Sequence, residues 1–539
     1  MTRCQLYLKT TIVNTDPERA MTQTVMRHEQ AADMQILIIG SGFAGICMAI
    51  RLKQAGIHSF TILERAPEVG GTWRDNTYPG CACDVQSHVY SFSFEPNPTW
   101  SRMFAEQPEI NAYLKHCASK YGILPHLRCG ENVVRAEYDE SSCTWTVHTS
   151  TGGTYRARVV VSGMGGLSNP AYPQIPGLDR FEGRSFHSAA WDHDFDLRGK
   201  RVAVIGTGAS AIQFVPQIAP KVEKLFVYQR SAPWIVSKAD RRVTRLEQAL
   251  FRKLPFMQGL MRQALYWKLE SRAFAFVVKP ELMQQAERMA KNHIEKQIRD
   301  PELRRKVTPD YQIGCKRILL SDDYYPALTR PNVDLITTPI REVGAHSVID
   351  QNGNERAVDA IVFGTGFRTQ DFIERGAFTG VGGTDIVDAW RGGIEAYKGA
   401  TVSGFPNLFF ICGPNTGLGH NSIIYMIEAA CSYILDAIVT MRERGWAAVD
   451  VRPEVQAAYN RDLQAKLGTA VWQSGCKSWY LDENGRNTAL WPDFTFRFKK
   501  LTRSFDAEAY RPVRLGDVVA AGSDSAIQES LAAAAAATA

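Results

Sequence analysis

Two glycine-rich segments, each followed at the same distance by a residue of opposite charge, are the strongest indication of chemistry in the sequence. Gly40 to Gly45 and Gly206 to Ala211 both follow a short apolar run, and Glu64 and Arg230 each lie 24 positions beyond the first glycine of their segment. In a strand–helix–strand nucleotide-binding unit, that later position faces the adenosine ribose. A carboxylate there accepts from a free 2′-hydroxyl, and a guanidinium accommodates a 2′-phosphate. The pair therefore predicts two different dinucleotides in one chain.

The first segment has the residues needed to hold a pyrophosphate. Glycine permits the tight turn after a strand and lets backbone N–H groups approach phosphate oxygens, and the positive end of the following helix favours the phosphate charge. Glu64 suits an adenosine ribose without a 2′-phosphate, as in FAD or NAD. The predicted binding residues of this unit are Gly40, Ser41, Gly42, Gly45 and Glu64.

The second segment has the same design with a basic residue at its ribose position. Alanine replaces the third glycine, which the pattern tolerates. Arg230 selects NADP over NAD only if its guanidinium points at the ribose, and Lys316 could add a second cation. The predicted binding residues of this unit are Gly206, Thr207, Gly208, Ala209, Ser210 and Arg230.

Cysteine spacing separates two kinds of flavoprotein that would both carry such a pair of units. A flavin disulfide reductase needs a redox dithiol beside the flavin, and the sequence contains no CxxC or CxxxxC. Cys81 and Cys83 form a CxC without zinc-ligand partners, so we interpret them as structural thiols and predict no metal site. The eleven cysteines are irregularly spaced, which is typical of a reducing compartment. Oxygen chemistry by a flavin monooxygenase is therefore favoured.

Length and composition place these motifs in a large globular chain. The sequence has 539 residues, of which 45% are hydrophobic and 22% charged, as in an ordinary soluble protein. This length predicts roughly three to four structural units. A net charge of +6 is too dilute to indicate a nucleic-acid partner. The longest apolar run, Ile36 to Ile50, contains three glycines and is too short to cross a bilayer, so we expect a cytoplasmic protein without a transmembrane segment.

Short β-branched runs and helical segments alternate around both glycine patterns. This alternation predicts an α/β fold with two Rossmann-like dinucleotide-binding domains. Residues 240–310 differ, because they contain 16 Lys or Arg against 9 Asp or Glu, and the apolar spacing from Leu246 to Leu265 indicates one amphipathic helix face. We interpret this segment as a solvated helical insert rather than a membrane-docking one.

Residues 181–192, which lie between the two patterns, read FEGRSFHSAAWD. This segment resembles the FxGxxxHxxxW(P/D) signature of type I Baeyer–Villiger monooxygenases, whereas the related N- and S-oxygenating flavin monooxygenases end it in Tyr or Phe. Four further segments follow the order of that family, so the resemblance covers about residues 34–510. They are Gly70 to Trp73, Tyr78 to Asp84, Lys316-Arg317 and Ser478 to Tyr480.

The resemblance implies a role for most of these segments. Asp84 and Arg317 would meet over the reactive face of the flavin as the catalytic pair, and Trp479 would sit on a mobile loop covering NADP. Arg74-Asp75 and Thr77 depart from the family, which carries aromatic residues and Arg there, and this bears on substrate range more than on reaction type. The cofactor-binding residues implied in addition to the two glycine units are Gly71, Thr72, Trp73, Asp84, Tyr90, Val134, Ser231, Lys316 and Trp479.

The implied chemistry explains why the pair is charged. NADPH would reduce FAD, O2 would form a C4a-peroxyflavin, and its attack on a ketone would give an oxyanion that rearranges to an ester or lactone. Arg317 would supply a positive charge that cannot deprotonate, and Asp84 would hold it in place. From spacing alone, the two residues fit an ordinary salt bridge equally well. The identity of the ketone and the oligomeric state are not readable from the sequence.

Two alternatives remain open. An N- or S-oxygenase would use the same flavin chemistry, and a degenerate two-nucleotide fold could act as a redox-sensing or binding protein. His187 suits a hinge or hydrogen-bonding role as well as a catalytic one, Trp191 suits packing, and His420 suits a helix cap, so none is assigned to catalysis. The expected organisation is a disordered leader at 1–33, an FAD-binding domain at 34–165 and 400–514, an NADPH-binding domain at 166–239 and 311–399, the helical insert at 240–310 and a disordered tail at 515–539.

Overall fold

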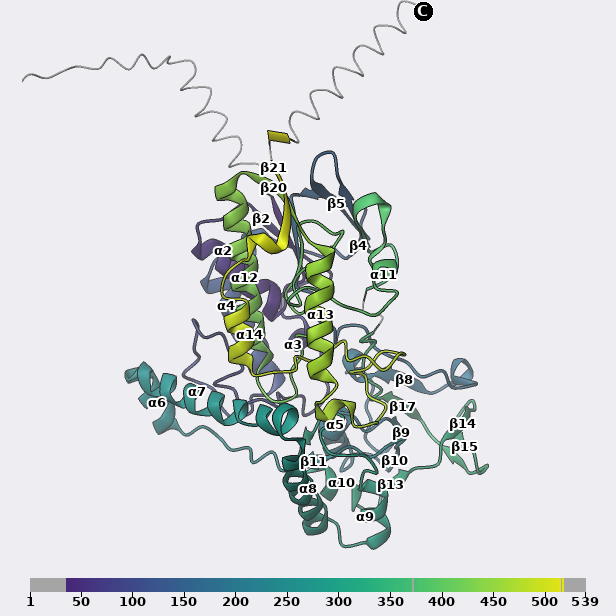
Figure 1. Cartoon of the computed structure of the whole chain (residues 1–539). Coiled ribbons are helices and arrows are strands. Elements are labelled where there is room, and N and C mark those ends of the chain that lie inside the picture. The colour runs from purple at the N-terminus through teal and green to yellow at the C-terminus, as the bar shows by residue number, and fades with distance from the viewer. Residues whose placement is uncertain (1–34, 371–372, 515, 518–539) are drawn as a thin grey trace, which may run out of the picture.

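The computed structural model describes residues 35–370, 373–514 and 516–517. Its centre is two five-stranded parallel sheets, one in each of two lobes, with a separate group of helices at the side of the second (Figure 1). Both sheets have the strand arrangement of a doubly wound α/β fold, so the predicted fold class is confirmed. The expected leader at 1–33 and nearly all of the tail at 515–539 lie outside the described residues.

The first sheet has the strand order β19-β7-β1-β2-β3, and all its pairings are parallel. Strand β1 is buried along its whole length because helices cover one face and a second sheet covers the other. Helices α2 (Phe43–Gln54) and α12 (Ile423–Arg444) pack together over one face. The strands are β1 (Ile36–Ile39), β2 (Phe60–Glu64), β3 (Leu127–Cys129), β7 (Val159–Ser162) and β19 (Leu408–Phe410).

A four-stranded sheet with the order β18-β4-β5-β6 packs against the other face. Trp145 and Phe378 of this sheet share a buried cluster with Leu37 and Ile39 of β1. Strand β18 pairs with β4, so the chain returns to the first lobe before residue 400, the boundary that the sequence suggested. The strands are β4 (Val133–Asp139), β5 (Thr144–Thr149), β6 (Thr154–Ala157) and β18 (Phe378–Thr379).

Helix α12 is the one described helix long and apolar enough to cross a membrane. More than half of its apolar window is buried inside the protein, where it contacts α2 and contributes to the largest core cluster. It begins at the Ser422 cap, whose hydroxyl accepts from the N–H of Ile424, and ends at Gly445 in the left-handed region. We therefore identify α12 as a core helix of the first lobe.

The second sheet has the order β13-β10-β9-β17-β8 and is also parallel throughout. Helices α5 (Ala211–Ile218) and α10 (Tyr324–Leu328) pack together in this lobe. A small antiparallel sheet contributes Val343 and Val348 to a cluster on the other side. The strands are β8 (Arg184–His187), β9 (Arg201–Ile205), β10 (Lys224–Tyr228), β13 (Val333–Ile336), β14 (Ile340–Val343), β15 (Ser347–Asp350), β16 (Glu355–Ala357) and β17 (Ala360–Phe363).

The segment predicted as one amphipathic face is two helices that meet at Leu254 and Pro255. Proline fits the first turn of a helix but not its interior, so a new helix begins there. Leu246 is consequently 81% exposed, whereas Leu265 is buried. The helices of this region are α6 (Arg245–Lys253), α7 (Pro255–Glu270), α8 (Met283–Gln297) and α9 (Pro301–Val307), and the short paired strands β11 (Ile235–Val236) and β12 (Leu319–Leu320) flank them.

The remaining named helices and strands lie mainly in the first lobe and its C-terminal segment. They are α3 (Thr72–Asp75), α4 (Gln107–Lys120), α11 (Ile386–Ala389), α13 (Pro453–Leu467), α14 (Thr495–Leu501), β20 (Trp446–Val451) and β21 (Tyr510–Arg514).

Candidate active site

Glu64 ends β2 with its carboxylate already oriented by the first glycine segment. Its Oε2 accepts from the backbone N–H of Ser41 at 2.8 Å and from the Ser41 hydroxyl at 2.7 Å, and its Oε1 accepts from the N–H of Ala66 at 3.0 Å. Burial raises the pKa of Glu64, but these bonds and the Arg74 guanidinium outweigh it, so the pKa lies below its usual value. The carboxylate is therefore ionised and fixed at the carboxyl end of the sheet.

The glycines of this segment are required by close backbone packing. Gly40 has a φ of +93°, and a Cβ on Gly45 would lie 1.9 Å from the carbonyl oxygen of Gly40. A Cβ on Gly71 would lie 3.0 Å from the Cα of Gly42. The structure thus brings the predicted Gly71-Thr72-Trp73 segment onto the first glycine segment, although the two are far apart in sequence.

Two predicted aromatic residues form one wall beside this cradle. Trp73 donates from Nε1 to the hydroxyl of Tyr90 at 3.1 Å, and both rings are edge-on to one another. Phe43, at the start of α2, also meets Tyr90 edge-on. Val134 lies in β4, which belongs to the separate four-stranded sheet, and is 48% exposed.

The second glycine segment follows β9 in the same way. Gly206 has a φ of +106°, and a Cβ there would lie 2.4 Å from the carbonyl oxygen of Gly364, so the two segments cross closely. Thr207 is buried and donates from Oγ1 to the carbonyl of Ser231 at 3.4 Å. Gly208, Ala209 and Ser210 complete the turn, and Ser210 immediately precedes α5.

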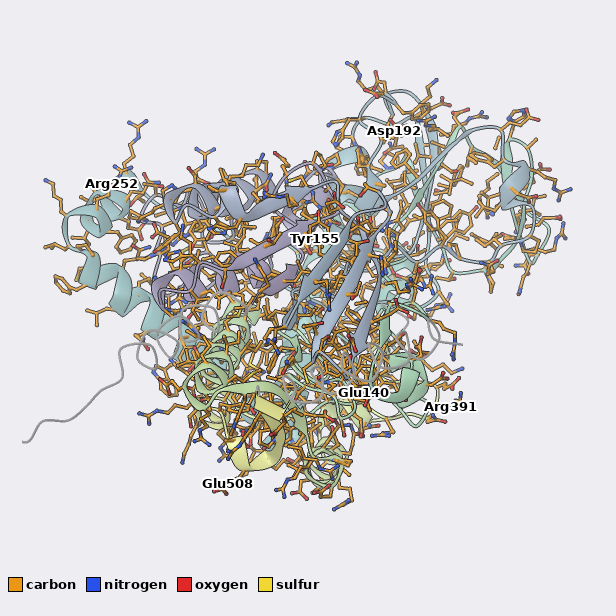
Figure 2. The ribbon with its side chains drawn as sticks, turned by 90° about the horizontal axis from the view of Figure 1, so that it is seen from above. Glu140, Tyr155, Asp192, Arg252, Arg391 and Glu508 are labelled. Carbon is orange, nitrogen blue, oxygen red and sulfur yellow. A yellow bond between two sulfur atoms is a disulfide. The ribbon has the colours of Figure 1, made fainter. Side chains whose placement is uncertain are left out.

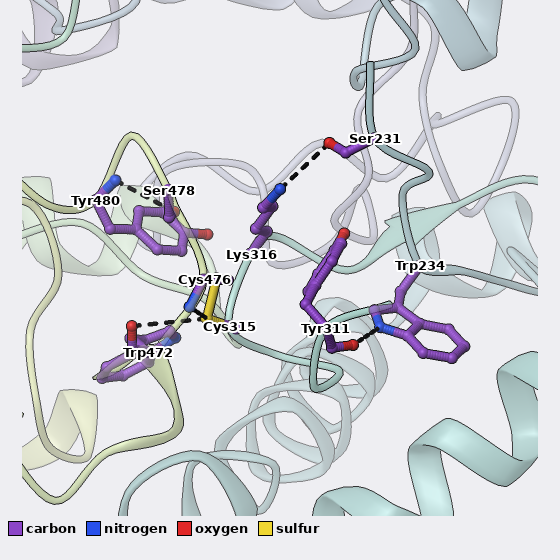
Figure 3. Close-up of a disulfide and its surroundings, with 9 residues drawn as sticks. All are labelled: Ser231, Trp234, Tyr311, Cys315, Lys316, Trp472, Cys476, Ser478 and Tyr480. Carbon is purple, nitrogen blue, oxygen red and sulfur yellow. Dashed lines mark hydrogen bonds between the residues drawn. A yellow bond between two sulfur atoms is a disulfide. The ribbon is translucent and has the colours of Figure 1, made fainter. Parts of the chain in front are cut away.

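Arg230, Ser231 and Lys316 come together beyond the carboxyl end of β10. Lys316 donates from Nζ to the Ser231 hydroxyl at 3.2 Å and lies 4.4 Å from the centre of the Tyr311 ring (Figure 3). Burial and then the nearby Arg230 lower the pKa of Lys316. Two cations that repel one another beside a hydroxyl form a favourable site for an anion such as a phosphate.

Asp84 and Arg317 form the ion pair that the family resemblance implied. Arg317 donates from Nε to Asp84 Oδ2 at 3.0 Å and makes a second bond to the same oxygen from Nη2. The adjacent Asp84 carboxylate raises the pKa of Arg317 above its usual value, so the guanidinium remains charged at every working pH. The two side chains are 27% and 36% exposed, which leaves one side of the pair accessible.

Gln213, which the sequence analysis did not single out, connects the two lobes at this pair. It lies on α5 and accepts from the Tyr78 hydroxyl at 2.9 Å, while its Nε2 donates to the carbonyl of Ala82 at 2.9 Å. Gly80 has a φ of +79°, and a Cβ there would lie 2.8 Å from the carbonyl oxygen of Gln213. The Tyr78 to Asp84 segment is therefore fitted to α5, and no local sequence signal marks Gln213 as its partner.

A disulfide between Cys315 and Cys476 is a feature that the sequence did not indicate. These residues are 161 positions apart, and their spacing gives no indication of pairing. Cys315 precedes Lys316-Arg317, and Cys476 precedes the segment of Ser478 and Tyr480, so the bond joins the two regions directly (Figure 3). Cys81 and Cys83 are free and buried, as structural thiols should be.

Trp479 is 43% exposed on this C-terminal segment. Gln370 donates from Nε2 to its carbonyl oxygen at 3.0 Å, and its ring lies against Tyr480 with centres 4.4 Å apart. Tyr480 is buried, and burial raises its pKa to about 12. The segment carrying Trp479 is thus anchored beside Arg317 while the indole itself faces solvent.

Of the residues that depart from the family, Arg74 contacts Glu64 Oε1 at 3.0 Å and donates to Asp75 at 2.8 Å. Thr77 hydrogen-bonds His193 of the linker at 2.7 Å. A cleft of about 310 Å³ opens next to α3, and its lining includes Arg65, Arg74, Asp75, Asn169 and Phe367.

The three unassigned aromatic and histidine residues are all structural in their contacts. His187 is fully buried, accepts from the N–H of Ala189 at 3.1 Å, and burial lowers its pKa. Trp191 packs against Phe186 and Phe214. His420 is buried 3.7 Å from Glu270 and does not cap α12, because Ser422 does.

Comparisons with known proteins agree with this geometry. Residues 37–247 match the family model described as "Pyridine nucleotide-disulphide oxidoreductase". A Baeyer-Villiger monooxygenase of Pseudomonas aeruginosa is 56% identical over 89% of this chain and 92% of its own. A solved structure of an oxidized steroid monooxygenase bound to NADP is 30% identical, with a TM-score of 0.80 over 90% of this chain and all of the other.

A complex of OTEMO with FAD and NADP has a TM-score of 0.81 at 24% identity, over 89% of this chain and 99% of the other, which supports the shared fold. The match to the Pseudomonas relative extends over 482 residues, so it covers well over two thirds of both chains. The chain therefore belongs to the Baeyer–Villiger monooxygenase family.

Proposed function

We propose that this enzyme uses FAD, NADPH and O2 to convert a ketone into an ester or lactone, with Arg317 as its central catalytic residue. The observation that carries the proposal is the Asp84–Arg317 ion pair, which joins the loop after α3 to the segment after the helical insert. A permanently charged guanidinium with one accessible side can stabilise negative charge that develops on a reacting oxygen. A fully enclosed salt bridge could not reach a bound reactant.

The residues of the first lobe fit FAD. Gly40, Gly42 and Gly45 leave a cradle that a Cβ would fill, and the following helix α2 directs its positive end toward a pyrophosphate there. Glu64 is ionised and would accept from a ribose hydroxyl. Gly71, Thr72, Trp73 and Tyr90 form the adjoining wall on which we place the flavin ring.

The residues of the second lobe fit NADPH. Arg230 and Lys316 would bind the 2′-phosphate together with the Ser231 hydroxyl, since Lys316 already donates to Ser231. Thr207 and its neighbours would approach the pyrophosphate at the start of α5. Trp479 is exposed on its anchored segment, and we propose that it covers the bound coenzyme.

In the mechanism, FAD supplies the hydride-accepting and oxygen-activating chemistry when it is bound. Arg317 would attract the negative charge that forms on oxygen and then on the former carbonyl oxygen of the ketone. Asp84 would hold the guanidinium by two hydrogen bonds from Arg317, and thereby fix its direction. Gln213 would keep the Asp84 loop against the second lobe, so that nicotinamide, flavin and Arg317 share one site.

The domain boundaries that we propose follow the sheets. The FAD-binding domain would comprise residues from 35 to about 165 and the C-terminal region from β18 onward, because β18 and β19 pair with its strands. The NADPH-binding domain would hold the second sheet and carry the helices of residues 240–310 as an insert. We also propose a cytoplasmic location, since the apolar helix α12 belongs to the core.

The deciding experiment is a panel of linear, cyclic, aromatic and steroidal ketones with the purified FAD-loaded enzyme, followed by mass spectrometry. We expect NADPH-dependent addition of one oxygen atom to at least one ketone, with an ester or lactone as product. A matched panel of thioethers and amines distinguishes the alternative. Oxygenation of those compounds without any ester or lactone would assign the enzyme to N- or S-oxygenation and contradict the proposal.

A further inference from the structure

The outer face of α7 is apolar, although it faces solvent. After Pro255, the exposed positions of this helix recur every three or four residues, so they form a single stripe. Phe256 is 61% exposed, Leu260 60% and Trp267 56%, whereas the opposite face is buried against the first lobe. The exposed positions are Phe256, Gly259, Leu260, Gln263, Ala264, Trp267 and Lys268.

Neighbouring elements extend this stripe. Leu254, at the junction of α6 and α7, is 43% exposed. Phe496 of α14 is 38% exposed, and its ring centre lies 6.1 Å from that of Trp267. We call the exposed side chains of Leu254, Phe256, Leu260, Trp267 and Phe496 the apolar ridge. Bulky apolar groups grouped in this way on an outer surface mark an interaction site.

Cations without acidic partners surround the apolar ridge. Arg252 and Lys253 lie at the end of α6, Lys268 lies on the exposed face of α7, and Lys500 lies on α14; none of the four forms an ion pair within the part of the chain that the structure describes. Lys499 lies 5.4 Å from the ring centre of Tyr425, which stacks on Tyr266 beside Trp267.

The acidic residues of α6 and α7 do not compensate these cations. Glu247 is bound to Arg241 at 2.8 Å, and Glu270 is buried and hydrogen-bonded to Asn421 and Thr495. The surface around the apolar ridge therefore has a net positive charge, and its partner must be both apolar and anionic.

We infer that the apolar ridge and its cations bind an anionic lipid membrane surface. Helices α6 and α7 project from the body of the protein, and Arg252 lies at the outer end of this arm (Figures 1 and 2). A projecting ridge with Phe, Leu and Trp at its crest and Lys and Arg at its flanks can enter the headgroup region of a bilayer. The sequence pattern alone had favoured a solvated insert, because it did not reveal that the large apolar groups of α7 point outward.

A second copy of the chain is a less suitable occupant. A twofold contact through the apolar ridge would place its cations opposite the same cations of the other copy. Like charges brought together in this way oppose association, whereas anionic headgroups neutralise them. The inference does not depend on the catalytic roles proposed above.

The test uses the full-length FAD-loaded enzyme in flotation assays with two kinds of vesicle, one of phosphatidylcholine alone and one with about equal parts of phosphatidylglycerol. We expect binding to the anionic vesicles only, and weaker binding as salt is raised. The double variant L260Q/W267Q should lower the partition coefficient between vesicles and water about a hundredfold, because each of the two side chains contributes roughly tenfold when it is buried in the bilayer. Charge reversal by K253E should lower it by at least about fivefold.

Leu124→Gln is the matched control, because Leu124 is 50% exposed on a different part of the first lobe. It should bind vesicles like the wild type, and all variants should keep the thermal stability and the flavin spectrum of the wild type. Failure of the wild type to float with anionic vesicles would overturn the inference. The inference would also be overturned if the protein did not bind vesicles and the L260Q/W267Q substitutions instead abolished a stable dimer or binding to an acidic protein.

Discussion

The substitution Arg230→Ala should weaken the binding of NADPH about tenfold and leave the binding of NADH nearly unchanged. Arg230 is exposed beside Ser231 and Lys316, where we place the 2′-phosphate. A hydrogen bond to a charged group contributes about 1.5–3 kcal/mol. Because Arg230 is exposed and Lys316 remains, the lower end of this range applies. This corresponds to about a tenfold rise in KM for NADPH.

The assay is steady-state coenzyme oxidation with a saturating ketone, together with stopped-flow reduction of the flavin by NADPH and by NADH. KM for NADH should change by less than about twofold, since NADH carries no 2′-phosphate to lose a contact. Arg198→Ala is the control, because Arg198 is exposed in the same lobe but precedes β9, at the amino end of the sheet. An equal loss of affinity for both coenzymes would refute the assignment of Arg230 to the ribose.

Three further changes test the site. Arg317→Ala should leave the flavin spectrum intact but lower the rate of ester formation by at least about a hundredfold, as loss of an oxyanion-stabilising group does. If the variant still formed ester at the wild-type rate, Arg317 would be excluded from catalysis. Glu64→Gln should weaken FAD binding at least tenfold, measured by flavin fluorescence. The pKa of Glu64 is lower in the folded state than in the unfolded state, so the stability that Glu64 contributes is present above about pH 4.5. This stability is lost as pH falls through the folded-state pKa. The acid unfolding curves of the wild type and of Glu64→Gln should therefore converge at low pH. Reduction of the Cys315–Cys476 bond by dithiothreitol should lower the free energy of unfolding by up to about 5 kcal/mol, because the bond spans 161 positions. The Cys476→Ser variant should not respond to dithiothreitol, whereas the control Cys129→Ser should respond like the wild type.

Local patterns were sufficient to predict the nucleotide-binding units. A strand, a glycine turn and a charged residue at the end of the next strand lie close together in sequence, so the placement of Gly40, Glu64, Gly206 and Arg230 in the fold could be predicted without tertiary information. The Asp84–Arg317 pair was different, because its residues are 233 positions apart and only the family resemblance connected them.

Other features depend on packing that no local pattern records. Gln213 is an unremarked polar residue on a short helix, and its importance comes from the loop that lies against it. Cys315 and Cys476 meet only because the C-terminal segment crosses to the second lobe. The helical period of α7 was readable, but the sequence could not show which of its faces packs against the first lobe.

The pairing of β19 with β7 has a consequence for synthesis of the chain on the ribosome. The sheet of the first lobe needs Leu408–Phe410 as its edge strand and α12 as a cover, and both leave the ribosome after the whole second sheet. The second lobe can therefore fold while β7 still lacks its edge partner β19 and α2 still lacks its neighbour α12. Ribosome-bound chains that end before residue 408 should expose the apolar face of α2, which makes the N-terminal region, although it is made first, the last to become protected.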